Sequence, residues 1–496
     1  MLLQEVIFAA TSAPSSSSGP GAINIHDVQT GSSFGSFKQS NAPVHCTSFV
    51  ESRNGQGGFV LAAQLDKSII NVYNFQKDQM ALKIVLPEKL TCLTVDPRGE
   101  FCAGGTAQGR IYLWEIASGI LYNSWDAHYR RVVVLKFTHD SAALLSGSED
   151  SGVSVWSVSR LLDDDLQNEL PMPYCTLSDH TLPVTDIVCG VGCFPTCRVL
   201  TSSVGHSVKL WDLAAKTLLT TFQFPQPIAC LAWDVTERMF FAGAEDGSIH
   251  QMNLFRHKKT NKSSAAPATE AIGGAGVSDI IRIGNEPSDG KKRLISVGQP
   301  ITCLAISLTS TLLLVGTAAG HIHIYDIPSH QALRTISTHA GLTITHLATL
   351  LKPPDLIGHA SVSLSAADAK DGIPVKPVAP FQRMRDAKAR EAHEVAMLLP
   401  IQNKPTMEDP LAYSTEEMLR DHAFFVQPTA SDTTSADDGI SLQAKVTGLE
   451  DEVMRLKEQL AKAKNVNDTM WETVVQRVMA QKKSKNEAME VDTDGH

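Results

Sequence analysis

A recurring strand pattern constrains the fold of this 496-residue chain more than any other feature. An apolar alternating run, a turn rich in Gly, Ser or Asp, and a second run ending in an aromatic or polar residue return up to about residue 350. The second runs are INIHD at 23–27, INVYN at 70–74, IYLWE at 111–115, VSVWS at 153–157, VKLWD at 208–212, IHQMN at 249–253 and IHIYD at 322–326. Their spacing matches four short strands with turns per unit. Residues 1–350 are therefore predicted to form an all-β, seven-bladed β-propeller.

Composition limits the class of protein. Hydrophobic residues make up 43% of the chain and charged residues 19%, as in folded soluble proteins. A net charge of −10 argues against extensive wrapping of nucleic acid, which requires many clustered cations. Nine cysteines scattered among apolar runs predict reduced thiols and an intracellular protein. We expect no membrane span, because no apolar run is long enough.

The two ends of the repeat region predict how the ring closes. The runs at 5–11 and 23–27 look like the second and third strands of a blade that lacks its first strand. The run TITHLATL at 343–350 follows His339 as other first strands follow a histidine. Pairing the two ends would remove exposed sheet edges. We expect residues 343–350 to complete the N-terminal blade.

Two insertions interrupt the repeats. Residues 256–297 are poor in large apolar side chains and predict a mobile loop, either a solvated surface loop or one that contacts a partner or RNA. Residues 160–174 form a smaller acidic insertion. The long insertion is bracketed by basic residues, namely Arg256, Lys258, Lys259, Lys262, Lys291, Lys292 and Arg293.

The pattern changes beyond residue 351. Residues 351–439 read as a Pro-rich linker with a short amphipathic helix at 381–399, and residues 481–496 as a disordered tail whose QKKSK weakly matches a nuclear import signal. Residues 440–480 carry a heptad stripe, which favours a coiled coil and a homodimer over a helix packed back on the propeller. The predicted dimer contacts are Val446, Leu449, Val453, Leu456 and Leu460.

Residues 126–157 resemble a complete WD repeat. Such a repeat contains a histidine, a strand serine, a turn aspartate and a tryptophan joined by hydrogen bonds, here His128, Ser146 or Ser148, Asp150 and Trp156, with Ser148 preferred. A Ser/His/Asp catalytic set is the alternative, but the arrangement recurs from blade to blade and is therefore read as structural.

Other blades keep only part of this set. His180 accompanies Trp211, but Gly205 stands where the aspartate would be, and Gln108 and Ala319 take that position in their blades. His321 and His323 alternate on a strand, so a solvent-facing or tetrad-like role is favoured over a metal pair. The sequence predicts no catalytic residue, metal or cofactor.

The segments DAHYRRVVVLKF, LLSGSEDSGVSVWSVSRLLD and SDHTLPVTDIVCG, with the C-terminal heptad helix, are similar to one WD-repeat family. This is the WD-repeat subunit of the Rix-Ipi pre-rRNA-processing complex, called the third Ipi protein in fungi and the WD-repeat protein eighteen in animals. The resemblance covers the propeller and the tail helix and is strongest over 126–190.

The resemblance implies a scaffold without catalysis, located in the nucleolus and nucleoplasm. It implies a role in removal of the second internal transcribed spacer during maturation of the pre-60S particle. The implied partners are a helical-repeat scaffold subunit, a second Ipi-type subunit and the midasin-type AAA ATPase. Two other classes remain open, namely a chromatin-associated or ubiquitin-ligase adaptor propeller, for example in replication licensing, and an enzyme.

Overall fold

The computed structural model divides into two units, residues 1–400 and 401–496, which are described separately. The described residues are 4–13, 21–51, 58–163, 170–257, 269–271, 279–283, 294–353, 356, 361–363, 372–374, 376–386, 388, 390, 392–395, 452–465, 467 and 469–471.

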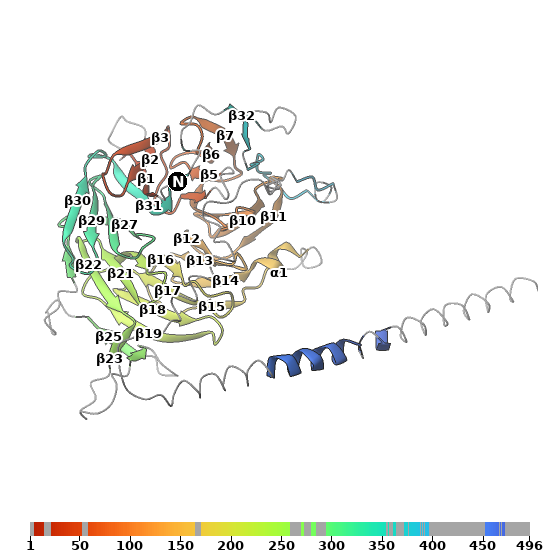
Figure 1. Ribbon diagram of the computed structural model, residues 1–496. Coiled ribbons are helices and arrows are strands. Elements are labelled where there is room, and N and C mark those ends of the chain that lie inside the picture. The colour runs from red at the N-terminus through yellow and green to blue at the C-terminus, as the bar shows by residue number, and fades with distance from the viewer. Residues whose placement is uncertain are drawn as a thin grey trace, which may run out of the picture. The chain divides into compact units, whose positions relative to one another are not determined.

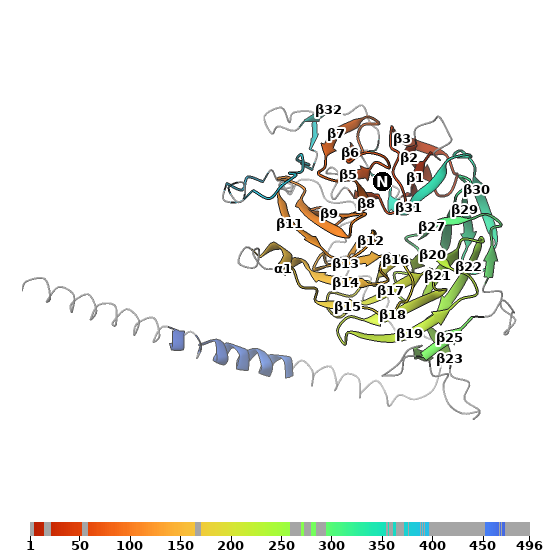
Figure 2. The ribbon, with the colours of Figure 1, turned by 180° about the vertical axis from the view of Figure 1, so that it is seen from behind.

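The first unit is a ring of seven antiparallel sheets, which confirms the seven-bladed propeller (Figures 1 and 2). Blade one contains β31 (Thr343–Leu351), β1 (Glu5–Ser12), β2 (Ala22–Asp27) and β3 (Ser33–Lys38). Blade two contains β4 (Thr47–Val50), β5 (Phe59–Ala63), β6 (Ile69–Asn74) and β7 (Met80–Val85). Blade three contains β8 (Leu90–Val95), β9 (Phe101–Thr106), β10 (Arg110–Glu115) and β11 (Leu121–Asp126).

The remaining blades follow the same order. Blade four contains β12 (Val132–Phe137), β13 (Ala143–Ser148), β14 (Val153–Ser157) and β15 (Cys175–Leu177), with helix α1 (Val158–Leu162) between the last two. Blade five contains β16 (Val184–Cys189), β17 (Arg198–Ser203), β18 (Ser207–Asp212) and β19 (Thr217–Gln223). Blade six contains β20 (Ile228–Trp233), β21 (Met239–Ala244), β22 (Ser248–Asn253) and β26 (Leu294–Ser296). Blade seven contains β27 (Ile301–Ile306), β28 (Leu312–Thr317), β29 (Ile322–Asp326) and β30 (Ala332–Ile336).

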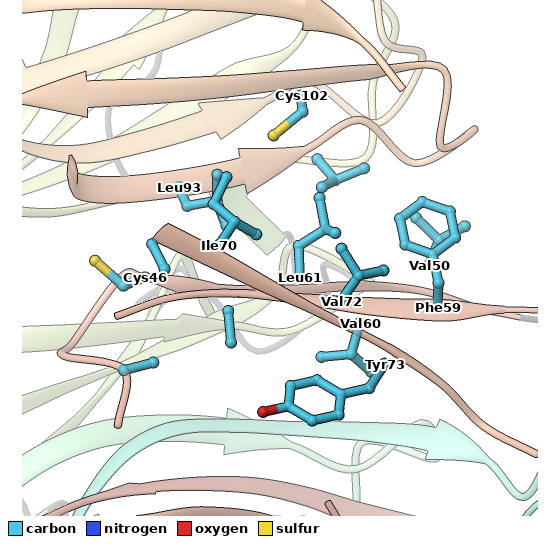
Figure 3. Packing of buried hydrophobic residues seen from close by; sticks show 14 of the residues in the cluster. Cys46, Val50, Phe59, Val60, Leu61, Ile70, Val72, Tyr73, Leu93 and Cys102 are labelled. Atoms are coloured by element: carbon cyan, nitrogen blue, oxygen red, sulfur yellow. The ribbon is translucent and has the colours of Figure 1, made fainter. Parts of the chain in front are cut away.

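The hydrophobic core lies between neighbouring blades. Each middle strand is covered on both faces, which is why a run such as FVLAA in β5 is apolar throughout and fully buried. Figure 3 shows this packing, with Phe59, Leu61 and Tyr73 of blade two in the same cluster as Leu93 and Cys102 of blade three. Burial of apolar surface on both sides of every blade makes the ring cooperative.

A repeated threonine links blades near the central axis. The register between the first and second strand shifts at one residue, and the hydroxyl of that residue donates to a carbonyl of the next blade. Thr91 donates to Val132 at 2.6 Å, Thr185 to Ile228 at 2.7 Å and Thr302 to Ile344 at 2.5 Å. The donor and the acceptor belong to different blades, so each bond joins neighbours.

The predicted ring closure is confirmed. β1 pairs with β31 in an antiparallel register that runs from Glu5 opposite Leu351 to Ser12 opposite Thr343. The C-terminal strand is thus the innermost strand of a blade whose other three strands come from the N-terminus. Both ends of the repeat region contribute to one sheet, and the ring has no open blade.

The long insertion differs from the mobile loop that we expected at 256–297. Within it, β23 (Phe255–His257) pairs with β24 (Thr269–Ala271), and β25 (Asp279–Arg282) adds to β19 as a parallel fifth strand of blade five. Ile281 and Ile283 pack against the core of that blade. The alternation DIIRI explains the docking, because it turns two isoleucines to one side. Residues 294–296 are the last strand of blade six and not part of a loop.

The segment after β31 also differs from expectation. Residues 381–386 are not helical, although the amphipathic pattern predicted a helix at 381–399. A single turn, in which the Ala392 amide donates to the Lys388 carbonyl, is the helical feature among the described residues there. Phe381 packs on the propeller, whereas Met384 is 80% exposed, so the described apolar residues do not form the common helical face that the pattern predicted. β32 (Ser361–Ser363) and β33 (Gly372–Pro374) form a short parallel pair before it.

In the second unit, residues 452–465 are helical.

Candidate binding surfaces of the propeller

The polar set of blade four is assembled around Ser146. The Nδ1 of His128 lies 3.1 Å from the Asp150 carboxylate, and its Nε2 lies 2.8 Å from the Ser146 hydroxyl. The indole N–H of Trp156 donates to the same hydroxyl at 3.0 Å. Four side chains, two from strands β13 and β14, one from the loop before β12 and one from a turn, are therefore joined in one chain of hydrogen bonds.

The sequence prediction preferred Ser148 as the serine of this set, and that choice was wrong. Ser146 and Ser148 lie on the same face of β13, but Ser148 is at the end of the strand. Its hydroxyl accepts from the Asp150 amide at 3.2 Å and donates to the Arg130 carbonyl at 3.3 Å. Ser146 lies one pleat deeper, within reach of both rings. Alternation alone does not distinguish the two positions.

The charge of this set belongs to Asp150. Burial raises the pKa of its carboxyl, but hydrogen bonds from His128, Gly152 and Tyr129 outweigh burial and lower the pKa to about 2. The ionised carboxylate therefore holds the imidazole and two backbone amides at once. Ser146, His128 and Asp150 are committed to binding one another and Trp156, so this arrangement stabilises the blade.

In other blades, the residues at the positions of His128 and Trp156 have different hydrogen-bond partners. In blade five, Thr201 replaces the serine, accepting from the Trp211 indole at 2.9 Å and lying 2.7 Å from His180 Nε2. In blade one, His26 takes the position of the tryptophan and Ala9 that of the serine. The two histidines of that blade, His26 and His339, then meet directly, with their Nε2 atoms 2.8 Å apart. Burial, and next the neighbouring His26, lower the pKa of His339 to about 4.

Blade three has no side chain for its tryptophan, because Gly104 stands opposite Tyr112 where blade four has Ser146. The Trp114 indole instead donates to the backbone carbonyl of Gln382 at 3.0 Å. A segment more than 260 residues later in the sequence thus replaces a missing hydroxyl. This segment, residues 376–395, docks on the surface of blade three, and we call the segment the strap.

The strap follows the turns at one end of blade three. Its Ala379 amide donates to the Ile116 carbonyl at 2.9 Å, and its Gln382 amide donates to the Gly119 carbonyl at 2.8 Å. Phe381 is 5% exposed and stacks on Trp114 with ring centroids 5.2 Å apart. Gly119 has a φ of +75°, and a Cβ there would lie 2.2 Å from the Pro380 carbonyl. The backbone approach therefore requires glycine.

The far end of the strap carries polar contacts. His393 Nε2 lies 2.6 Å from the Glu115 carboxylate. The Arg390 guanidinium lies over the Tyr122 ring, 4.8 Å from its centroid, and donates to the Tyr122 carbonyl. Lys376, at the near end, donates to the Arg98 carbonyl. The strap lies against the turn between β10 and β11 at one end of blade three, and His128 lies at the opposite end, outside the strap's contacts among the described residues.

Comparison with known proteins agrees with this architecture. The family model "WD domain, G-beta repeat" matches residues 119–157 and 216–251. The chain is 34% identical to "Pre-rRNA-processing protein IPI3" of Mycosarcoma maydis, over 85% of this chain and 86% of that protein. It is 28% identical to the protein of the same name in Yarrowia lipolytica, over 90% and 95% of the two chains. It is 33% identical to human "WD repeat-containing protein 18", over 64% and 67%.

The chain belongs to the IPI3 and WD repeat-containing protein 18 family. The aligned share of this chain, 85% and 90% with the two fungal proteins, is larger than the seven blades alone.

Most of the basic residues predicted for a partner or RNA loop lie outside the described residues. Arg256 lies in β23, and only its backbone is described. The others, Lys258, Lys259, Lys262, Lys291, Lys292 and Arg293, fall in the undescribed parts of the insertion.

The predicted dimer residues divide in the same way. Val446 and Leu449 lie outside the described residues. Val453, Leu456 and Leu460 lie on the helix over 452–465, and each is at least half exposed. The helix thus presents its apolar stripe to solvent within the single chain.

Two further kinds of site are a metal centre and a membrane-spanning helix. Among the described residues, no group of three or more His, Cys, Asp or Glu side chains is arranged to hold a metal ion. His321 and His323 each have a protein partner, Gln299 at 3.2 Å and Thr335 at 2.9 Å. In the described part of the chain, no helix is long and apolar enough to cross a membrane.

Sequence reasoning missed the strap. A signal was present, because the Pro-rich IPVKPVAP ends in a lone phenylalanine, and proline-stiffened segments that carry an aromatic residue are suited to docking. The destination of Phe381 could not be predicted, because the lack of a side-chain partner for the Trp114 indole follows from the register that places Gly104 opposite Tyr112.

Proposed function

We propose that the chain is a non-catalytic scaffold subunit of a nuclear pre-rRNA-processing complex. The observation that carries the proposal is its similarity to pre-rRNA-processing protein IPI3 over 85% of its length. A rigid ring with exposed loops is suited to holding partners, and the one complete Ser-His-Asp set is used to hold a blade together. The chain would act in internal-transcribed-spacer removal during maturation of the pre-60S particle.

The proposed partners are a helical-repeat scaffold subunit, a second Ipi-type subunit and a midasin-type AAA ATPase on the pre-60S particle. The proposed location is the nucleolus and nucleoplasm. The family resemblance supports this set, since IPI3 relatives are named for pre-rRNA processing. Contact of the basic residues of 256–297 with a partner or with RNA belongs to the same proposal.

Depletion of the protein tests this function. We expect precursors that retain the second internal transcribed spacer to accumulate on Northern blots. We also expect the tagged protein to co-sediment with pre-60S particles in a sucrose gradient. Normal precursor levels together with protein confined to the light fractions would contradict the proposal. Recovery with chromatin or a ubiquitin ligase would favour an adaptor instead.

We further propose that the C-terminal helix forms a homodimer. The support is the heptad stripe, whose described members Val453, Leu456 and Leu460 are exposed in the single chain. A dimer would raise the effective concentration of the second partner-binding event.

Replacing Val453, Leu456 and Leu460 by serine should halve the mass measured by light scattering and leave the propeller's thermal midpoint unchanged. The control is Lys462→Gln, which removes a solvent-exposed ion pair with Glu458 on the same helix. An unchanged mass in the triple variant would rule out this dimer interface.

A further inference from the structure

One loop of blade four combines an extremely exposed aromatic ring with a cation that has no partner. The loop joins β11 to β12, and in it Tyr129 is 97% exposed. The neighbouring Arg130 is also exposed. Among the described residues, nearby Arg110 pairs with Asp126 and Arg131 with Glu149, whereas the Arg130 guanidinium has no recorded partner. Both side chains of this pair are exposed to solvent.

The backbone of this loop is held at every residue. The His128 amide donates to the Gly109 carbonyl at 3.1 Å, and the Tyr129 amide donates to the Asp150 carboxylate at 3.1 Å. The Arg130 carbonyl accepts from the Ser148 hydroxyl at 3.3 Å. The Arg131 carbonyl accepts from the Glu149 amide at 3.0 Å. The complete polar set of blade four therefore anchors the loop that carries Tyr129 and Arg130.

A rigid loop with free side chains is suited to binding. Ordering a loop costs free energy on association, and a loop that is already ordered avoids this cost. Tyrosine and arginine are the residues most enriched among strong interface contacts. Leu182 and Val204, 46% and 41% exposed, lie at the same end of the adjacent blade five. Their proximity follows from the bond between the Val204 amide and the Pro183 carbonyl.

The charge of the loop selects the kind of ligand. A single-stranded RNA site requires several cations along a groove with stacking rings. In this loop the Arg131 guanidinium is paired with Glu149 and the Asp150 carboxylate accepts from the Tyr129 amide, so Arg130 is the one arginine of the loop without a partner among the described residues. This arrangement disfavours a phosphate backbone. It fits one carboxylate on Arg130 with an apolar side chain against Tyr129.

We propose that Tyr129 and Arg130 form a docking site for a protein segment that carries an acidic side chain next to an apolar one. The strap covers the opposite end of blade three, so the partner binds the open face of the ring. The proposal does not depend on the role in pre-rRNA processing.

A photo-crosslinker tests the site in the full chain. p-Benzoylphenylalanine is introduced at position 129 in cells, and the adduct is isolated and sequenced. The matched control position is Val235, a 61% exposed residue in the turn between β20 and β21, at the opposite end of a blade. We expect a protein adduct at position 129, and not at 235, whose crosslinked peptide contains Asp or Glu.

Charge reversal then tests the chemistry. Arg130→Glu should lower the yield of the adduct by about tenfold, and changing the acid of the crosslinked peptide to lysine should restore it. Melting curves of the variants should match the unmodified protein, because both side chains are exposed. A nuclease-sensitive adduct, a peptide without an acid, a yield no higher than at position 235, or failure of the charge swap to restore binding would each overturn the proposal. If the protein no longer associated with pre-60S particles but the adduct still formed, the result would contradict the proposed function and not the docking site.

Discussion

Single hydroxyl groups in this propeller serve two or more neighbours, so their removal has unequal consequences. Ser146 is wholly buried and bonds with both an imidazole and an indole. Ser148 is equally buried but bonds with backbone groups at the edge of a turn, where the strand ends. The depth of a serine in the blade therefore determines what its loss leaves unpaired.

Ser146→Ala should destabilise the propeller more than Ser148→Ala. The first change leaves His128 and Trp156 with buried unpaired nitrogens, at a cost of about 2 kcal/mol. The second change leaves backbone groups close to solvent, which water can reach, at a cost of about 1 kcal/mol. Urea denaturation followed by tryptophan fluorescence measures both. Equal losses, or a larger loss for Ser148→Ala, would contradict the role given to Ser146.

The histidine pair of blade one makes ring closure sensitive to acid. The two Nε2 atoms are too close for both to carry a proton. The pKa of His339 is lowered to about 4, chiefly by burial, whereas an unfolded histidine has a pKa near 6.5. The unfolded chain thus binds the extra proton between these values. The stability is full above pH 6.5 and falls as the pH drops toward 4.

His339→Gln should weaken this dependence. Near pH 5, the variant should take up about one proton fewer on unfolding than the unmodified chain, which appears as a shallower slope of unfolding free energy against pH. The control is His139→Gln, which changes an exposed histidine. If His339→Gln and His139→Gln gave the same slope, the contact between His26 and His339 would not be the source of this pH dependence.

At the scale of elements, the strap shows that the folded unit extends beyond the seventh repeat. Its aromatic ring, two backbone hydrogen bonds and the contact of His393 with Glu115 all lie on blade three. The strap supplies the hydrogen-bond acceptor for Trp114 that Gly104 lacks, so a missing hydroxyl within one repeat is replaced by a carbonyl from a segment outside the repeats.

A chain that ends at residue 375 should therefore melt at a lower temperature than one that ends at residue 400. Phe381→Ala should reproduce much of the loss, with a cost of at most about 3 kcal/mol, because the strap is able to detach without opening the ring. Trp114 should become more exposed, and its fluorescence should shift to longer wavelength. Identical melting of the two truncated chains would show that the strap contributes nothing to stability.

At the scale of the whole molecule, closure of the ring is the step that joins its two ends. β31 supplies the innermost strand of blade one, and Thr302 of blade seven donates to the Ile344 carbonyl of β31. Loss of this strand would expose the edge of β1 and the apolar face of blade seven together.

Deletion of residues 339–350 should destabilise all seven blades, not only the first. Each blade buries its apolar faces against two neighbours, so an opened ring loses cooperative packing. We expect a lowered thermal midpoint by circular dichroism and a tendency to aggregate through the free edge. A local loss, with the remaining blades melting at the original temperature, would contradict this view.

The sequence by itself determined the number of blades, the order of their strands and the way the ring closes. These features depend on local alternation and turns, which recur at a readable period. The choice of Ser146 over Ser148, the pairing of β25 with β19 and the docking of Phe381 on Trp114 were decided only by the tertiary structure. Each depends on what lies opposite a residue across a sheet or between blades, and such contacts join positions whose separation no period encodes.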